Sequence, residues 1–215
     1  YDIHTDGLQA GLNLYYMDYR RQLVLTGEIN DVGAPVMTNV PDSYRTGIEV
    51  LFASKISKLF SWDFNINLSK NKIKKFTAYV DNWDDGLQNR YELGESDIAF
   101  SPKIVAGNRL KFSPVEGLNF EFQSKYVGNQ FIDNTGSEDR KLDTWFVNDL
   151  RLEYVMHPGK LELISFNILI ANIFNEEYES NAWVYRYIYD GSEYKYDGYF
   201  PQAGINLLAG IKIRF

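Results

Sequence analysis

The sequence predicts an all-β protein: a transmembrane, antiparallel, up-and-down β-barrel, to which this chain contributes about eight strands. Three observations support this class. Apolar and polar residues alternate with a period of two in eight segments. The connections between these segments alternate between short and long, and no Asp, Glu, Lys or Arg falls on the apolar faces.

The alternation is clearest at the end of the chain, where side chains from Ile205 to Phe215 alternate between an apolar face and a mixed face. With their flanks, we expect strands of about ten to fourteen residues, longer than the ~5–6 typical of soluble sheets. Asn108 interrupts the apolar face of the fourth segment. The eight segments are residues 8–16, 48–52, 62–68, 104–112, 118–125, 150–156, 164–170 and 205–215.

The connections differ in length in a regular order. Short turns are expected around residues 57–59, 113–117 and 157–159. The other connections exceed the ~12–15 residues beyond which a loop is usually functional or disordered. In an up-and-down sheet, alternate connections emerge at opposite ends, so all short turns lie at one end and all long loops at the other, as in bacterial outer-membrane barrels. The long connections are residues 23–43, 75–97, 129–143 and 175–204.

The absence of charge from the apolar faces has an energetic reason in a membrane. An Arg or Lys that faces lipid near the midplane costs about 2–4 kcal/mol. A lumen filled by water or by a plug accepts charged side chains on the opposite face. The residues expected to face the lumen include Glu49, Asp63, Glu121, Lys125, Asp149, Arg151, Glu153, Lys212 and Arg214.

The composition excludes several functional classes. The 215 residues include no cysteine and two histidines, so thiolate catalysis, disulfides and a His- or Cys-rich metal centre are excluded. The net charge of −7, without a long basic run, argues against a nucleic-acid partner. The chain contains no run of ~18 apolar residues that could cross a bilayer as a helix. Catalysis has little support, because His4 lies at the start of the chain and His157 at a predicted short turn.

Two other architectures fit the same alternation. A soluble carbohydrate-binding sandwich would bury the apolar faces in its core. A self-contained eight-stranded barrel for adhesion or membrane anchoring would pair its first strand, residues 8–16, with its last, residues 205–215.

Several stretches resemble the C-terminal barrel portion of TonB-dependent outer-membrane receptors, especially those of Bacteroidetes-type bacteria. The final amphipathic strand ends on Phe215, which is similar to the terminal signal that the barrel insertion machinery reads. The other matching stretches are residues 14–27, 42–49, 101–103, 125–130, 133–135, 171–178 and 199–204, in the family's order.

The resemblance implies a 22-stranded barrel that encloses an N-terminal plug and imports a scarce nutrient, such as a ferric siderophore, haem or cobalamin. Residues 1–215 would then be the C-terminal part of the barrel, located in the cell outer membrane as a multi-pass protein. Its expected partners are the lipid membrane, the remainder of the receptor with its plug, and, through that part, the TonB energy complex. A glycan or peptide importer with a surface lipoprotein is the alternative. We expect no enzyme activity and no cofactor.

The connection 175–204 holds the main candidate binding residues. The pair Asp190-Gly191 between two alternating runs predicts a hairpin, so a ribbon above the membrane is expected. Its tyrosine-rich face is either a platform for a ligand or partner or a set of cross-strand pairs that stabilise the hairpin. The candidates are Trp183, Tyr185, Tyr187, Tyr189, Tyr194 and Tyr196.

Trp83 is a further candidate, in the carboxylate-rich segment 81–86. Oxygen ligands there could bind Ca²⁺, but the spacing lacks the full EF-hand pattern, so a solvated turn is the favoured interpretation and no metal site is predicted. Trp62, near the short turns, and Trp145, near the long loops, are expected in the two aromatic girdles at the membrane interfaces.

Overall fold

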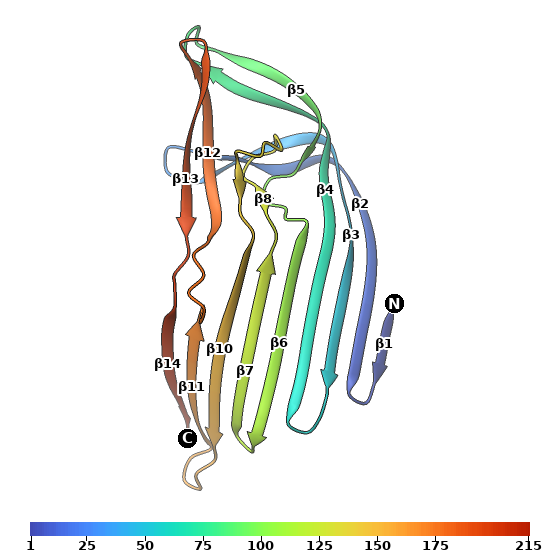
Figure 1. Ribbon diagram of the computed structural model, residues 1–215, viewed down its shortest axis with the longest axis vertical. Helices are drawn as coiled ribbons and strands as arrows, with labels where there is room; N and C mark the ends of the chain where they lie inside the picture. Colours follow the sequence, from blue (N-terminus) through green and yellow to red (C-terminus); the bar gives the residue numbers. More distant parts are fainter.

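The computed structural model describes residues 1–215 as a curved, mainly antiparallel sheet of 12 strands and a separate sheet of two short strands. Ribbons rise from one rim of the large sheet and lean towards each other (Figure 1). No helix is long and apolar enough to cross a membrane. The strands are β1 (Asp2–Thr5), β2 (Leu8–Ile29), β3 (Pro35–Lys55), β4 (Phe60–Asn82), β5 (Leu87–Asp97), β6 (Ile104–Val115), β7 (Leu118–Val127), β8 (Gln130–Phe131), β9 (Lys141–Leu142), β10 (Trp145–Met156), β11 (Leu163–Ala171), β12 (Glu179–Tyr189), β13 (Ser192–Pro201) and β14 (Asn206–Arg214).

Eight long strands form the wall of the sheet, in the order β2-β3-β4-β6-β7-β10-β11-β14, with the short β1 beside β2. This confirms the predicted eight strands. The sheet stays open, since β14 pairs only with β11 and not with β1 or β2. The self-contained eight-stranded barrel is therefore wrong, because it requires the first and last strands to pair.

The connections sort by length as predicted. The turns β3–β4, β6–β7 and β10–β11 are short and lie at one end, and the long connections lie at the other (Figure 1). The β6–β7 turn consists of Glu116 and Gly117, and Gly117 has a φ of 80°, which a residue without a side chain adopts easily. The sequence analysis missed one more short turn, between β1 and β2.

Three strands are much longer than expected. β2, β3 and β4 have 22, 21 and 23 residues, because their hairpins continue as ribbons above the wall. β4 makes this possible by changing its partner: residues 60–68 pair with β6, and residues 72–82 pair with β5. Much of the connections 23–43 and 75–97 is thus strand rather than loop.

The register separates an apolar face of the wall from a polar face. On the apolar face the rings of Phe60 and Phe112 stack at 4.5 Å, and Phe112 and Phe120 lie 6.2 Å apart. Side chains of this face are uncovered: Leu14 is 69% and Ile211 66% exposed. The soluble sandwich is wrong, because a second sheet would cover this face.

Asn108, a polar residue on the apolar face, has a hydrogen-bond partner. The indole Nε1 of Trp62 donates a hydrogen bond to Asn108 Oδ1 at 2.6 Å, and the Trp62 ring packs against Phe52 at 5.0 Å. The Asn108 side chain is therefore bound within the wall, which reduces the cost of a polar group on this face. Trp62 lies near the short turns on the apolar face, where a girdle residue is expected.

The girdle assignment of Trp145 is wrong. Trp145 shares the polar face with Asp149, four residues further along β10, because side chains alternate along a strand. It is only 8% exposed, its ring packs at a tilt against Tyr178 with the centroids 4.6 Å apart, and the ammonium of Lys125 lies 5.4 Å from its ring centroid. The next residue, Phe146, is on the apolar face and 49% exposed.

The buried core lies where the ribbons meet, above the wall. Val24, Val40, Ile73 and Ile98 form one cluster, which joins β2, β3 and β4 to the β5–β6 connection. A second cluster joins the β7–β10 connection to the ribbon β12–β13. Its members are Ile132, Leu142, Ala182 and Val184, with Phe100 packed against them.

Candidate functional site

The ribbon β12–β13 is a regular hairpin, as predicted. Tyr185 lies opposite Tyr196 and Tyr187 opposite Tyr194, so all four side chains share one face. The turn residues Asp190 and Gly191 have φ values of 49° and 68°. Two residues with positive φ are what a tight two-residue hairpin needs.

Five aromatic side chains meet on this face, and we refer to Trp83, Tyr185, Tyr187, Tyr194 and Tyr196 as the aromatic cluster. Tyr187 is at its centre and only 8% exposed. Its ring centroid lies 4.2 Å from Trp83, 5.2 Å from Tyr196, 5.7 Å from Tyr194 and 6.0 Å from Tyr185. The outer rings remain accessible, since Trp83 is 53% and Tyr196 56% exposed.

Trp83 joins the cluster because the tip of the β4–β5 ribbon is bound to β12. Two residues of β4 pair in parallel with Tyr187 and Ile188, and the backbone N–H of Trp83 donates to Ile188 O at 2.9 Å. The N–H groups of Asp190 and Gly191 donate to the two oxygens of Asp84 at 2.7 and 2.8 Å. We call this set of contacts between the two ribbon tips the clasp.

The carboxylates of segment 81–86 bind polypeptide groups. Asp81 accepts hydrogen bonds from the Tyr185 hydroxyl at 2.7 Å and from Gln88 Nε2 at 2.8 Å, and Asp85 accepts one from the Leu87 N–H at 2.9 Å. No group of three or more His, Asp or Glu side chains is arranged to hold a metal ion. The segment is neither a calcium loop nor a freely solvated turn, because Asp84 belongs to the clasp.

Two predicted residues lie outside the cluster. Tyr189 is 58% exposed at the end of β12 and stacks with no other ring. Trp183 lies opposite Gly198, and its indole covers the space that a side chain at that position would fill. Phe215, the predicted insertion signal, follows the last strand directly and is 93% exposed.

Ionisation within the cluster is suppressed. The hydrogen bond with Tyr196, together with burial, raises the pKa of Tyr187 to about 12. Burial, and then the hydrogen bond to Asp81, raises the pKa of Tyr185. Both phenols are therefore neutral at physiological pH, and their rings keep an electron-rich face.

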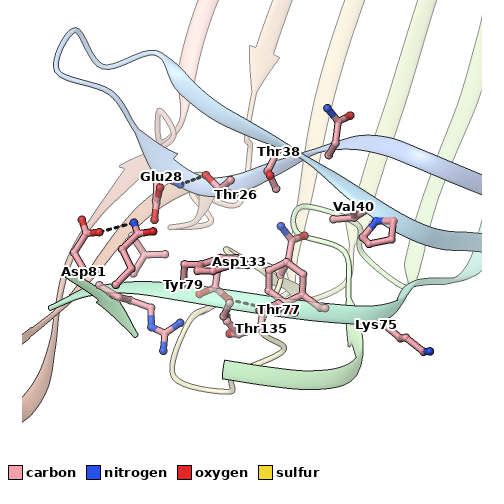
Figure 2. A pocket seen from close by; sticks show the side chains of 18 residues that line it. Thr26, Glu28, Thr38, Val40, Lys75, Thr77, Tyr79, Asp81, Asp133 and Thr135 are labelled. Atoms are coloured by element: carbon pink, nitrogen blue, oxygen red, sulfur yellow. Dashed lines mark hydrogen bonds between the residues drawn. The ribbon is translucent and has the colours of Figure 1, made fainter. Parts of the chain in front are cut away.

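A cavity of ≈ 380 Å³ lies between the β2–β3 and β4–β5 ribbons, beside the clasp (Figure 2). Glu28 and Asp81 lie near one end of it and Lys75 at the other. Burial raises the pKa of Glu28, and the nearby carboxylates of Asp81 and Asp133 raise it further. The cavity was not predicted, because its lining comes from six separate segments of the chain.

Two stretches that the sequence analysis singled out hold the rim together. Asn134 accepts a hydrogen bond from the Ala99 N–H at 2.8 Å and donates one to Leu25 O at 2.6 Å. Asn172 accepts one from the Glu176 N–H at 2.8 Å, with a φ of 50° that asparagine tolerates. These side chains have structural roles.

Residues 1–175 match the family model described as TonB dependent receptor-like, beta-barrel. The chain belongs to this family. Members are transport receptors and not enzymes, in agreement with the absence of a predicted catalytic group.

Solved receptors share the fold of this TonB-dependent receptor-like barrel. The siderophore receptor PiuA from Acinetobacter baumannii aligns with a TM-score of 0.67 at 13% identity, over 100% of this chain and 27% of its own. The ferric preacinetobactin receptor BauA of the same species aligns with a TM-score of 0.67 at 12% identity, over 100% of this chain and 28% of its own. The ferric-catecholate import receptor Fiu of E. coli K12 aligns with a TM-score of 0.63 at 16% identity, over 97% of this chain and 25% of its own. The chain thus spans about a quarter of each of these receptors.

Proposed function

We propose that this chain is the C-terminal part of an outer-membrane receptor that imports a scarce nutrient by coupling to TonB. The remainder of the receptor would supply the plug and the other strands of a 22-stranded barrel. The nutrient class that we favour is the ferric siderophore, with haem and cobalamin as the related classes.

The observation that carries this proposal is the open wall of eight strands whose ribbons all rise from one rim. The strand edge of β14 and most of the edge of β2 have no partner in the sheet. An unpaired edge is not tolerated in lipid, so further strands must complete the barrel. The family match and the fold of the siderophore receptors support the same assignment.

In this proposal the aromatic cluster contacts the nutrient outside the membrane. Its rings are rigid, and Tyr and Trp offer both apolar surface and hydrogen-bonding groups to a ligand. The apolar face would contact lipid, and Phe215 would mark the chain for insertion. A surface lipoprotein partner stays a prediction.

The test is uptake by the native organism with and without the complete receptor. We expect deletion of the receptor to abolish uptake of one ⁵⁵Fe-loaded siderophore from a panel and to leave other iron sources usable. Restored uptake with the wild-type gene, but not with one that lacks the plug, would support coupling through the plug. Loss of oligosaccharide or peptide uptake, with iron uptake unchanged, would contradict the siderophore assignment.

A further inference from the structure

The negative charge of the chain is concentrated at the rim. The four long connections, residues 23–43, 75–97, 129–143 and 175–204, contain 19 acidic and six basic residues. The rest of the chain contains 10 acidic and 16 basic residues. The net charge of −7 therefore combines −13 in the four connections with +6 in the rest of the chain, from which Lys70 and Lys72 pair with Glu95 and Asp97.

Five of the six basic residues in these connections are neutralised by ion pairs. The sixth, Lys75, lies about 20 Å along β4 from Asp81 at the rise of an extended strand. The ion pairs are Arg90 with Glu92 (2.6 Å), Arg140 with Asp133 (2.8 Å), Lys141 with Glu138 (2.5 Å), Arg186 with Glu193 (2.7 Å) and Lys195 with Asp197 (3.0 Å).

The aromatic cluster faces none of these cations. Arg186 and Lys195 lie opposite each other in the ribbon β12–β13, and the period of two places them on the face that points away from Tyr187. Three carboxylates, by contrast, lie in the segment 81–86 that carries Trp83. Glu28 adds a fourth carboxylate across the cavity, which Arg186 also lines, and it acts electrostatically on Tyr185.

We infer that the aromatic cluster binds its ligand through a cationic group, an ammonium or a guanidinium, held against the exposed rings next to Asp81 and Glu28. A cation over a Trp or Tyr face is attracted by the ring quadrupole. A rim of one sign also attracts opposite charge and repels a ligand of its own sign. The inference rests on the proposed function and narrows its substrate class to ligands that present positive charge.

The test uses the complete receptor in detergent and two aromatic probes of opposite charge, benzyltrimethylammonium and benzenesulfonate. Binding is followed by isothermal titration calorimetry, so that variants without Trp83 can be measured as well. We expect saturable binding of benzyltrimethylammonium, weakened about fivefold in Trp83→Leu, which is the size of an exposed cation–π contact. Salt at 0.5 M should weaken it as well, because screening shortens the reach of the rim charges.

A second variant separates charge from folding. Glu28→Gln keeps the size of the side chain, and no hydrogen bond to the Glu28 carboxylate is present, so the ribbons should stay intact. We expect weaker binding of benzyltrimethylammonium in this variant. Glu116→Gln, in a short turn at the opposite end of the wall, is the matched control and should bind as the wild type does.

The inference would be overturned if benzenesulfonate bound more tightly than benzyltrimethylammonium. It would also be overturned if salt, Trp83→Leu and Glu28→Gln all left the binding of benzyltrimethylammonium unchanged. The assay involves neither TonB nor uptake, so it fails separately from the proposed function. A receptor that imports a ferric siderophore but selects the anionic probe would refute only the cationic ligand. A receptor that selects the cation but imports no nutrient would refute only the import assignment.

Discussion

The two halves of β4 carry the same alternation into different surroundings. In the wall, Phe60 and Leu68 are 47% and 42% exposed. In the ribbon, Ile73 and Val80 of the same strand are 0% and 1% exposed. The wall leaves its apolar side chains exposed, whereas the ribbons bury theirs in a small protein core. A sequence period of two is therefore compatible with either fate, and the pairing partner decides which one applies.

The largest expected effect is a charge placed in the ribbon core. Val184 is 2% exposed, and an unpaired buried carboxylate costs about 3–5 kcal/mol. Val184→Asp should therefore open the ribbon β12–β13 while the wall stays folded. Hydrogen exchange of the complete receptor should show faster exchange in residues 179–201 and in the segments that pack on them, but not in the wall. Tyr189→Asp, at an exposed site of the same strand, is the control. Unchanged exchange in Val184→Asp would contradict this core.

A charge on the apolar face of the wall should cost slightly less. Ile168 is 37% exposed in β11, and an Arg facing lipid near the midplane costs about 2–4 kcal/mol. Ile168→Arg should lower the free energy of unfolding of the complete receptor in phospholipid vesicles by that amount, measured by urea titration. Asn167→Arg places the same charge on the polar face and should be tolerated. Equal losses in both variants would show that this face does not contact lipid.

The smallest effect concerns pH at the ribbon tips. The folded pKa of Tyr187, about 12, is above the ~10 of an unperturbed tyrosine. Its contribution is therefore fully present below pH ~10 and is lost as the pH rises through the folded value. Absorbance at 295 nm should show tyrosines that ionise late, and Tyr187→Phe should make this late step smaller. Tyr189→Phe should leave this late step in place.

The wall was predictable from the sequence because its physics is local. Eight segments alternate, the turns are short, and these features fix strand number and the sorting of connections. Trp145 shows where a correct pattern was not followed far enough. The polar face that includes Asp149 continues back to Trp145, and the same alternation places Phe146 on the apolar face.

The site was predictable only in part. The tyrosines of β12 and β13 were identifiable, because a hairpin brings near neighbours in sequence together. Trp83 was identified as a candidate as well, but its contact with Tyr187 joins residues more than 100 positions apart. Such a contact depends on how the β4–β5 and β12–β13 ribbons lean towards each other above β6, β7 and β10 of the wall. The cavity beside it was missed for the same reason.

The clasp also bears on how this part of the molecule folds, because it joins residues that are far apart in the sequence. Asp84 and Asp190 are 106 residues apart, so their contact must await the closure of a very long loop of chain. β12 begins only eight positions after β11 ends, so the placement of β6, β7, β10 and β11 in the wall fixes where its tip lies relative to Asp84. Before the clasp forms, the tip of the β4–β5 ribbon lacks its partner, the tip of the β12–β13 ribbon. Joined tips therefore indicate that the strands beneath them are in place in the wall.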